Sequence, residues 1–279
     1  MKLKVAIAGF GRVGQRRFFF LKKKKKIFKI ISISDRYSEY RKKFKNGKIY
    51  EDYKQMLKYE DIDVLFVCLP NKDSANATIM GLQKGCHVFC EKPPARNLKE
   101  LKKVQKALKK TKKLVLRYGF NHRYHNSVQF AKKIIDKKKY GDIINLRGVY
   151  GKSYLTPKLN ASPQIKYRFG WRTRKKEAGG GILLDQGIHL IDLMNFFVGN
   201  FIESKSYISK NFWKKDVEDN VYTLLKNKNN VFAMFHSSAT LWKHQFLFEI
   251  VLTKGMIILS GILSGTKSYG KEKIILIEK

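Results

Sequence analysis

The first part of the chain alternates short apolar runs with segments of helical periodicity. The apolar runs have the length of β-strands and cover residues 2–8, 28–34, 63–69, 86–90 and 114–117. The helical segments cover residues 15–25, 50–59, 74–84 and 97–109, the last with Asn97 as its N-cap. Runs that are apolar on both faces are typical of a parallel sheet covered by helices on either side. This pattern predicts an α/β domain with a Rossmann sheet.

The alternation of strands and helices stops near Asn121, and strands dominate the rest of the chain. A basic amphipathic helix is predicted at residues 126–140, and strands at residues 143–151, 201–209, 217–225, 231–237, 246–253 and 256–259. Short polar turns between strands favour a largely antiparallel open sheet. We therefore predict two domains: an α/β domain, residues 1–121, and an α+β domain, residues 122–279.

One long apolar segment, residues 177–197, interrupts these strands and carries three polar side chains. Asp185, His189 and Asp192 are four and then three residues apart, which places them on one stripe of a helix. Most other positions after the triple glycine are apolar, so we expect the helix to be buried nearly all round and to cover one face of the sheet. Buried carboxylates and imidazoles are costly unless they are paired or face a polar cavity. The trio is therefore either a satisfied core network or an acid/base site.

The first predicted strand runs directly into a glycine-rich loop and a helix. The loop has the GxGxxG pattern in its required context, with the residues Gly9, Phe10, Gly11, Arg12, Val13 and Gly14. Gly9 makes the turn, Gly11 lets the backbone approach a pyrophosphate, and Gly14 lets the helix pack closely on the strand. The N-terminus of the helix would hold the phosphates. The loop predicts a dinucleotide site.

The second predicted strand ends in Asp35, about 20 residues beyond the last glycine of the loop. An acidic side chain at this place accepts hydrogen bonds from the ribose hydroxyls of the adenosine, which favours NAD. Arg36, directly after it, is suited to a 2′-phosphate and leaves NADP open as the alternative.

Ligands of an open α/β sheet gather at the carboxyl ends of its strands. Two later strands end in short polar segments that we expect to contact the cofactor: Leu69, Pro70, Asn71, Glu91 and Lys92. Lys92 follows a buried strand and precedes two prolines, where a nicotinamide ring and its substrate should meet. The alternative is a solvated lysine, since the chain is rich in lysine.

The composition narrows the class of protein. The 279 residues include 59 Lys+Arg and 22 Asp+Glu, a net charge of +37, which can mark a protein that binds nucleic acid or a membrane surface. Lysine is spread over the whole chain together with many Ile, Phe, Tyr and Asn, as A+T-rich coding produces, and no nucleic-acid-binding motif accompanies it. We expect no specific nucleic-acid partner, and an anionic substrate would benefit from the same charge.

The apolar runs and the cysteines indicate the compartment. No apolar run approaches the roughly 18–20 residues of a membrane span, and the N-terminus reads as a strand rather than a signal peptide. Cys68, Cys86 and Cys90 are odd in number and lie in apolar runs, so we expect free thiols in a reducing compartment. Their spacing does not suit a metal. We predict a cytoplasmic protein with no membrane partner and no metal site.

These motifs together resemble the glucose-fructose oxidoreductase / inositol dehydrogenase (Gfo/Idh/MocA) family. The resemblance rests on motifs that occur in family order over almost the whole chain: the glycine loop, Pro70-Asn71, Glu91-Lys92-Pro93, Asn121-His122-Arg123, Trp171-Arg172 and Gly179-Gly180-Gly181 followed by Asp185, His189 and Asp192. It implies that residues 1–121 form a Rossmann domain that binds NAD(P), and that residues 122–279 bind the substrate and carry an open sheet through which the family forms homo-oligomers. It also implies oxidoreduction of sugars or cyclitols with a nicotinamide cofactor.

The resemblance also implies a reaction centre made of Lys92, Asp185 and His189. His189 is the predicted base, because an unperturbed imidazole titrates at about pH 6.5. Lys92 would stabilise negative charge on the reacting oxygen or, if burial lowers its pKa, relay the proton. Asp185 would either orient substrate hydroxyls or hold Lys92 charged. We expect Arg123 and Arg172 to bind an anionic part of the substrate. Asp192 is interpreted as a structural partner, and Asn121 as a cofactor contact.

The substrate is the least defined part of the prediction. By resemblance, the aromatic and basic stretch 242–270 looks like that of members associated with bacterial surface polysaccharides, which points to a nucleotide-linked sugar. Two other functions stay open on the same fold: an NAD-dependent glycosidase that recycles its cofactor, and a non-catalytic sugar or nucleotide sensor.

Overall fold

The computed structural model describes residues 2–111, 113–152, 170–241, 243–262 and 268–278. The chain forms two compact units. The first comprises residues 1–119 together with 176–179, and the second comprises residues 120–175 and 180–279. The roles assigned from the sequence to domains 1–121 and 122–279 stay predictions.

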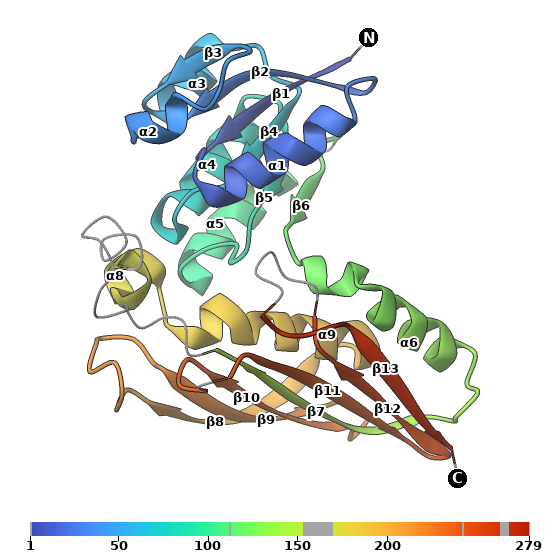
Figure 1. The fold of residues 1–279 in the computed structure, drawn as a ribbon. Helices are drawn as coiled ribbons and strands as arrows, with labels where there is room; N and C mark the ends of the chain where they lie inside the picture. Colours follow the sequence, from blue (N-terminus) through green and yellow to red (C-terminus); the bar gives the residue numbers. More distant parts are fainter. Residues whose placement is uncertain (1, 112, 153–169, 242, 263–267, 279) are drawn as a thin grey trace. The chain divides into compact units, whose positions relative to one another are not determined.

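The first unit is a parallel sheet with the strand order β3-β2-β1-β4-β5-β6. Its strands are β1 (Leu3–Ala8), β2 (Phe28–Ser34), β3 (Lys48–Tyr50), β4 (Val64–Val67), β5 (His87–Cys90) and β6 (Leu116–Tyr118). Its helices are α1 (Arg12–Lys23), α2 (Ser38–Arg41), α3 (Tyr53–Tyr59), α4 (Asn71–Gln83) and α5 (Leu98–Lys109), and Figure 1 shows them around the sheet. This strand order is that of the doubly wound dinucleotide-binding fold, so the predicted fold class of this part is confirmed.

The central strand β1 is buried on both faces. Val5 and Ile7 belong to one apolar cluster and Ala6 and Ala8 to another. Because successive side chains of a strand point to opposite faces, the two clusters lie on the two sides of the sheet. The continuous apolar pattern of this run therefore reflects cover on both faces, as the sequence predicts.

Helix α2 was not predicted, and the segment around β3 and α3 differs from the prediction. The segment 50–59 is not helical throughout, because Tyr50 ends β3 and the helix α3 begins at Tyr53. Asp52 sets this start, since its carboxylate accepts a hydrogen bond from the Lys54 N–H at 3.0 Å. Strand β3 itself is short and largely exposed, and it exists because it pairs with β2.

The second unit is built on a sheet with the order β13-β12-β11-β7-β10-β9-β8. Its strands are β7 (Ile143–Gly151), β8 (Phe201–Ser209), β9 (Asn220–Asn227), β10 (Phe232–Ser238), β11 (Gln245–Leu252), β12 (Gly255–Ser260) and β13 (Lys273–Glu278). Strands β7 and β10 pair in parallel, and the other pairs are antiparallel. The predicted, largely antiparallel sheet is confirmed, although the parallel pair was not anticipated. Strand β13 was not predicted.

The helices of the second unit lie on one face of this sheet in Figure 1. They are η1 (Asn121–Tyr124), α6 (Asn126–Asp136), η2 (Trp171–Thr173), η3 (Leu183–Gly187) and α9 (Ile188–Val198), and the short α8 (Lys175–Ala178) bridges the two groups of residues. Helix α9 packs Leu190, Leu193, Met194 and Phe197 into the core with side chains of β7, β10 and β11. The prediction that this segment covers one face of the sheet is confirmed.

The apolar segment is not one regular helix. Its first turn, η3, is a π-helix that passes directly into the α-helix α9 at Ile188. Every residue from Leu183 to Val198 is buried or half-buried, as the sequence predicts. Short π-helical turns are often found at functional sites.

One stretch of the described residues, Lys175–Val198, is long and apolar enough to cross a membrane by length and composition. The sequence prediction that no such run exists is therefore wrong. The most apolar window of this stretch has a mean hydropathy of 1.2 despite its polar residues. Half of that window is buried inside the structure, and the core helix of a soluble protein passes the same test.

Candidate functional site

The glycine loop between β1 and α1 has the backbone that its sequence predicts. Gly9 has φ +89°, and a Cβ there would lie 2.5 Å from the Cys68 carbonyl oxygen. A Cβ on Gly14 would lie 2.0 Å from the Gly9 carbonyl oxygen. A Cβ on Gly11 would meet only the Tyr40 ring, at 3.9 Å. Packing within the protein therefore requires glycine at positions 9 and 14 but not at position 11.

The start of α1 fits a phosphate group. Its N-cap, Gly11, offers no side-chain oxygen, and the first turn contains no acidic residue. The first N–H groups of the helix thus have no side-chain cap, and the positive end of the helix dipole is not neutralised. Together with the open space at Gly11, this suits the pyrophosphate of a dinucleotide. Arg12 and Val13 begin the helix, and both are exposed.

Asp35 lies at the end of β2, beside the same loop. One of its carboxylate oxygens accepts a hydrogen bond from the Phe10 N–H at 2.7 Å, and the other from the Tyr37 N–H at 3.0 Å. These bonds fix the carboxylate while leaving lone pairs for further donors. Arg36 is exposed and lies 3.7 Å from an oxygen of Asp73 in α4. The contacts of Asp35 and Arg36 with the cofactor stay predictions.

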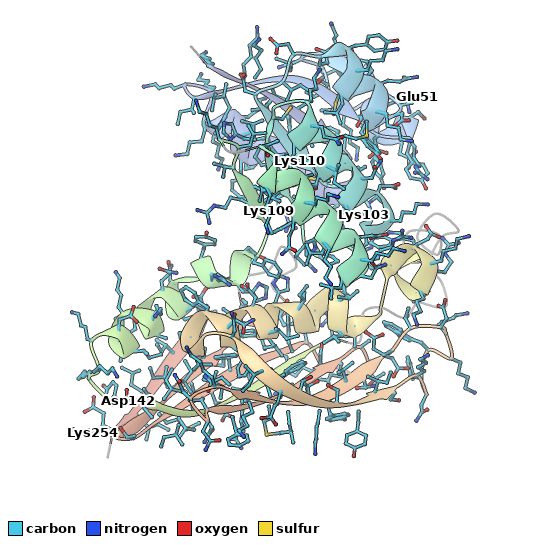
Figure 2. All side chains as sticks on the ribbon, turned by 180° about the vertical axis from the view of Figure 1, so that it is seen from behind. Glu51, Lys103, Lys109, Lys110, Asp142 and Lys254 are labelled. Carbon is cyan, nitrogen blue, oxygen red and sulfur yellow. The ribbon has the colours of Figure 1, made fainter. Side chains whose placement is uncertain are left out.

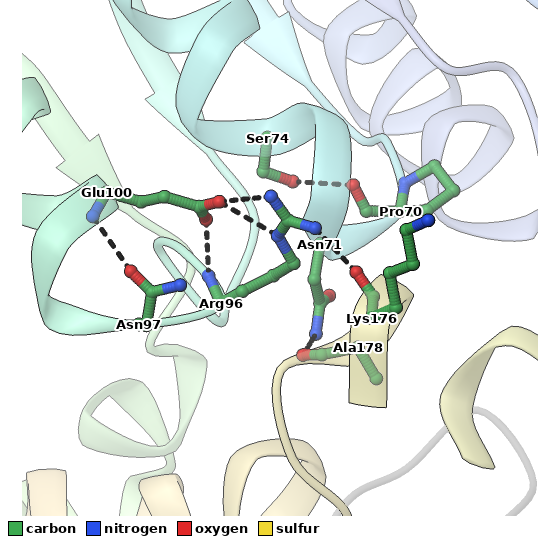
Figure 3. Close-up of polar contacts among 8 residues, drawn as sticks. All are labelled: Pro70, Asn71, Ser74, Arg96, Asn97, Glu100, Lys176 and Ala178. Atoms are coloured by element: carbon green, nitrogen blue, oxygen red, sulfur yellow. Dashed lines mark hydrogen bonds and ion pairs between the residues drawn. The ribbon is translucent and has the colours of Figure 1, made fainter. Parts of the chain in front are cut away.

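The segment 176–179 is held to the rest of the first unit by side chains that donate hydrogen bonds to its backbone carbonyl groups (Figure 3). Asn71 donates to the Ala178 carbonyl at 2.8 Å, and Arg96 donates to the Lys176 carbonyl at 2.5 Å. A Cβ on Gly179 would lie 2.3 Å from the Arg96 carbonyl oxygen. The first glycine of the triple glycine thus permits this close approach. Asn71 is buried, and its contact with the cofactor stays a prediction.

The Glu91-Lys92 segment follows β5. Glu91 accepts a hydrogen bond from Arg17 of α1 at 2.6 Å, and the Arg17 guanidinium lies 4.8 Å from the centre of the Phe89 ring. Arg17 could not be singled out from the sequence, because one arginine in a basic helix has no distinguishing pattern. Lys92 is half-buried, and its bond to Pro93 is cis. Leu69 and Pro70, after β4, are also half-buried.

In the second unit, Asp185 lies between two cations. The Lys152 ammonium is 3.2 Å from one carboxylate oxygen, and the Arg172 Nε is 3.8 Å from the other. Arg172 also lies over the Trp171 ring, 4.4 Å from its centre. The structure thus brings the predicted pair Asp185 and Arg172 together and adds Lys152, which the sequence analysis missed. The only signal was its place directly after a predicted strand.

His189 is almost completely buried, with 4% of its surface exposed. Its ring stacks on that of His122, with centres 3.8 Å apart and planes 15° apart. The rings of Phe120 and Tyr150 lie further out, at 6.1 and 6.2 Å. Two imidazolium ions this close would repel each other, so the stack favours a state in which at most one ring is charged. His122 was noted in the sequence only as part of a motif.

Two tyrosines lie near Asp185, and a histidine lies near its partner Lys152. Burial raises the pKa of Tyr150 well above its ordinary value, and burial likewise raises the pKa of Tyr269 to about 12. The Tyr269 hydroxyl accepts a hydrogen bond from the Gln186 amide at 3.1 Å. Burial, and then the charge of Lys152, lower the pKa of His244, whose ring centre is 5.0 Å from that of Tyr269. Near neutral pH the phenols are therefore protonated and serve as hydrogen-bonding groups rather than bases.

Glu218 fixes the start of the helical segment that carries Asp185. Its carboxylate accepts hydrogen bonds from the N–H groups of Gly181 at 2.8 Å and Leu183 at 3.1 Å. A Cβ on Gly181 would lie 1.9 Å from the Glu218 backbone oxygen. The last glycine of the triple glycine is thus required by contact with a residue 37 positions away, which no local pattern reveals.

Arg123 binds Asp192 with two hydrogen bonds, of 2.7 and 2.6 Å. This bidentate ion pair supports the structural role inferred for Asp192. It also occupies the guanidinium that we expected to bind substrate, and the substrate role of Arg123 stays a prediction. Asn121, an expected cofactor contact, is exposed and begins η1 of the second unit.

Basic side chains occur on both units. In Figure 2, Lys103 and Lys109 lie on α5 of the first unit, Lys110 follows that helix, and Lys254 lies in the turn between β11 and β12 of the second unit. Among the residues that the structure describes, no group of three or more His, Cys, Asp or Glu side chains is arranged to hold a metal.

The strand order, the glycine loop and the uncapped helix define the first unit as a dinucleotide-binding Rossmann domain, joined to a unit with a mixed open sheet. Two family models match the chain: the oxidoreductase family with an NAD-binding Rossmann fold over residues 3–120, and the GFO/IDH/MocA C-terminal domain over residues 128–258. The chain therefore belongs to the GFO/IDH/MocA oxidoreductase family, and its first unit is the NAD-binding domain of that family.

Individual relatives agree with this assignment. D-glucoside 3-dehydrogenase of Escherichia coli (strain K12) is 31% identical over 76% of this chain, and the chain spans 58% of the length of that relative. A levoglucosan dehydrogenase in complex with NADH and levoglucosan has a TM-score of 0.83 at 24% identity, with 100% of this chain and 80% of that one covered. The WlbA dehydrogenase of Bordetella pertussis, in complex with NADH and UDP-GlcNAcA, has a TM-score of 0.83 at 18% identity, with 92% and 78% covered.

Proposed function

We propose that the protein is an NAD-dependent dehydrogenase that acts on a hydroxyl-bearing carbon of a sugar or cyclitol. The observation that carries the proposal is the buried His189 four residues after Asp185, at the junction of a π-turn and the core helix α9. Burying an imidazole costs free energy that polar contacts must offset, so a histidine on an apolar core helix calls for an explanation, and an acid/base role supplies one. Relatives named as sugar dehydrogenases support the same reaction class.

The chain's own residues have separate tasks in this proposal. The loop Gly9–Gly14 and the start of α1 would hold the pyrophosphate of NAD, and Asp35 would accept hydrogen bonds from a ribose. The bound nicotinamide would supply the hydride acceptor. His189 takes the hydroxyl proton, Asp185 accepts a hydrogen bond from a neighbouring hydroxyl, and Lys92 stabilises negative charge on the reacting oxygen.

We further propose that the substrate is a nucleotide-linked hexose derivative used in the synthesis of surface polysaccharide, and this is the first substrate class to test. Two cationic side chains beside Asp185, Lys152 and Arg172, support a substrate that carries negative charge. Part of the stretch 242–270, from which this class was inferred, lies outside the described residues. NAD is the proposed cofactor, with NADP as the alternative because Arg36 is exposed.

We also propose a cytoplasmic homo-oligomer that assembles through the sheet of the second unit. Large apolar side chains on this sheet are exposed, among them Tyr207 at 81%, Leu224 at 56% and Tyr222 at 53%. Apolar surface of this kind is typical of protein interfaces. The substitution Leu224→Glu should shift the molecular mass in solution to that of a smaller species, and an unchanged mass would remove this interface.

The experiment that tests the function is a substrate screen with purified protein. Nucleotide sugars, sugar phosphates and cyclitols are incubated with NAD or NADP, and the absorbance of the reduced cofactor is followed. Net reduction by one substrate class supports the dehydrogenase and excludes a glycosidase that recycles NAD. Binding of NADH and a sugar without turnover would identify a sensor instead.

The catalytic roles need matched variants. His189→Asn and Lys92→Met should each lower turnover about a hundredfold or more while leaving the affinity for NADH nearly unchanged. Lys254→Met, at an exposed turn of the second unit, is the control for loss of a lysine charge. Wild-type turnover in both site variants would remove the proposed roles.

A further inference from the structure

Lys152 is held in place by the backbone on which it stands. It follows Gly151, the last residue of β7, and its N–H donates to the Ser238 carbonyl at 2.9 Å, where β10 ends. A Cβ on Gly151 would lie 2.4 Å from a methyl group of Leu241, so the chain is closely packed at this point. The side chain therefore starts from a rigid position at the ends of two parallel strands.

From this position the ammonium group reaches Asp185. Its Nζ lies 3.2 Å from Oδ2, within hydrogen-bond distance, and the two side chains are only 18% and 21% exposed. Arg172 approaches the other oxygen but stays at 3.8 Å, beyond a hydrogen bond. Of these two cations, Lys152 makes the closer and more directional contact.

The contact has a chemical consequence for Asp185. A cation at hydrogen-bond distance favours the ionised carboxylate and restricts its rotation. An ionised carboxylate accepts hydrogen bonds and donates none. Asp185 is then suited to orient a hydroxyl group, and unsuited to deliver a proton to the reacting oxygen.

We propose that Lys152 is a positioning residue that holds Asp185 as an ionised hydrogen-bond acceptor for substrate hydroxyls. This inference rests on the proposed function, because it assigns Asp185 to substrate. Lys152 acts through Asp185 and need not touch the reacting atoms. The role separates Lys152 from the many solvated lysines of the chain.

The test compares Lys152→Met, Lys152→Arg, Asp185→Asn and the double variant K152M/D185N, with Lys254→Met as control. Lys152→Met should lower kcat/KM between about 10- and 100-fold, and Lys152→Arg should restore most of that loss. The affinity for NADH should stay within about twofold, because the first unit holds the cofactor. The double variant should be no worse than Asp185→Asn alone, since both changes remove one interaction.

The pH profile separates positioning from general structural damage. In Lys152→Met the carboxylate loses the closer of its two cations among the described residues, so the acid limb of kcat/KM should move to higher pH, by about one pH unit. A structural defect would lower the profile without moving that limb. Activity and a pH limb like those of Lys254→Met would overturn the proposal, as would additive losses in the double variant.

A failure of the proposed function is distinguishable from a failure of this inference. If the wild-type protein oxidises no sugar, crystal structures of the wild type and the two lysine variants decide the positioning claim by themselves. The Asp185 carboxylate should keep its orientation in Lys152→Arg and turn away in Lys152→Met. An unchanged orientation in Lys152→Met would overturn the inference.

Discussion

The ion pair between Arg123 and Asp192 gives a stability prediction whose size follows from the structure. Asp192 is 9% exposed at its side chain and accepts both hydrogen bonds of the guanidinium, which also lies 5.2 Å from the centre of the Phe196 ring. Removing one partner of a fully buried pair costs about 3–5 kcal/mol, because the other charge stays buried. Arg123 is 38% exposed, so solvent screening reduces the expected loss for Arg123→Met to about 2 kcal/mol.

Urea unfolding followed by tryptophan fluorescence measures this loss in the relevant part of the chain. The chain has three tryptophans, of which Trp171 and Trp213 belong to the second unit and Trp242 lies outside the described residues. Arg123→Met should lower the unfolding midpoint with an unchanged slope, and the double variant R123M/D192N should be more stable than R123M, because it leaves no unpaired carboxylate.

The same variants decide between two roles of Arg123. If Arg123→Met unfolds at the wild-type urea concentration but has a much higher KM for anionic substrates, the arginine binds substrate and the stability reasoning is refuted. If both single variants lose stability and the double variant recovers part of it, the pair joins η1 to α9.

Two further predictions concern the glycine loop and a pH-dependent contact. Gly11→Ala should leave the unfolding midpoint close to wild type but weaken NADH binding at least tenfold. Gly14→Ala should destabilise the fold, because its Cβ would meet a backbone oxygen at 2.0 Å. Fluorescence titration measures the NADH affinity and thermal unfolding measures the midpoints, and equal midpoints for the two variants would contradict the packing explanation. Burial by itself raises the pKa of Glu272, but hydrogen bonds from the Ser127 N–H and the His125 ring outweigh it and lower that pKa below its ordinary value. The ionised Glu272 thus stabilises the fold above the unfolded pKa of about 4.3. The higher melting temperature of the wild type relative to Glu272→Gln should be lost as the pH falls through the folded pKa of Glu272. A difference in melting temperature that stays constant from neutral to acid pH would contradict this prediction.

The sequence predicted those parts of the fold in which local pattern and tertiary packing agree. Strands β2, β7 and β8 have the predicted bounds, and Asn97 caps α5 by accepting the Glu100 N–H at 3.0 Å. Strand β3 has three residues and forms by pairing with β2. Strand β13, with a largely exposed pattern, forms by pairing with β12. Pairing with a distant strand leaves no periodic signal in so short or exposed a segment.

In the candidate site, too, the residues that were predicted have a local sequence pattern, and the residues that were missed depend on distant contacts. The spacing of Asp185, His189 and Asp192 was sufficient to single out the helix, because polar residues on an apolar segment are conspicuous. Lys152 and Glu218 were not found, since their importance comes from contacts with residues 33 and 37 positions away. The requirement for glycine at position 181 likewise follows from its contact with Glu218 rather than from local composition.

The central claim, that the protein oxidises a sugar or cyclitol hydroxyl with NAD, is tested most directly by the stoichiometry of cofactor reduction. Purified protein with NAD and its best substrate from the screen should form one NADH for each hydroxyl oxidised. The His189→Asn variant should form NADH at least about a hundredfold more slowly while binding NADH normally. A protein that binds NADH but reduces no NAD with any sugar or cyclitol, or whose His189→Asn variant is fully active, would contradict the account.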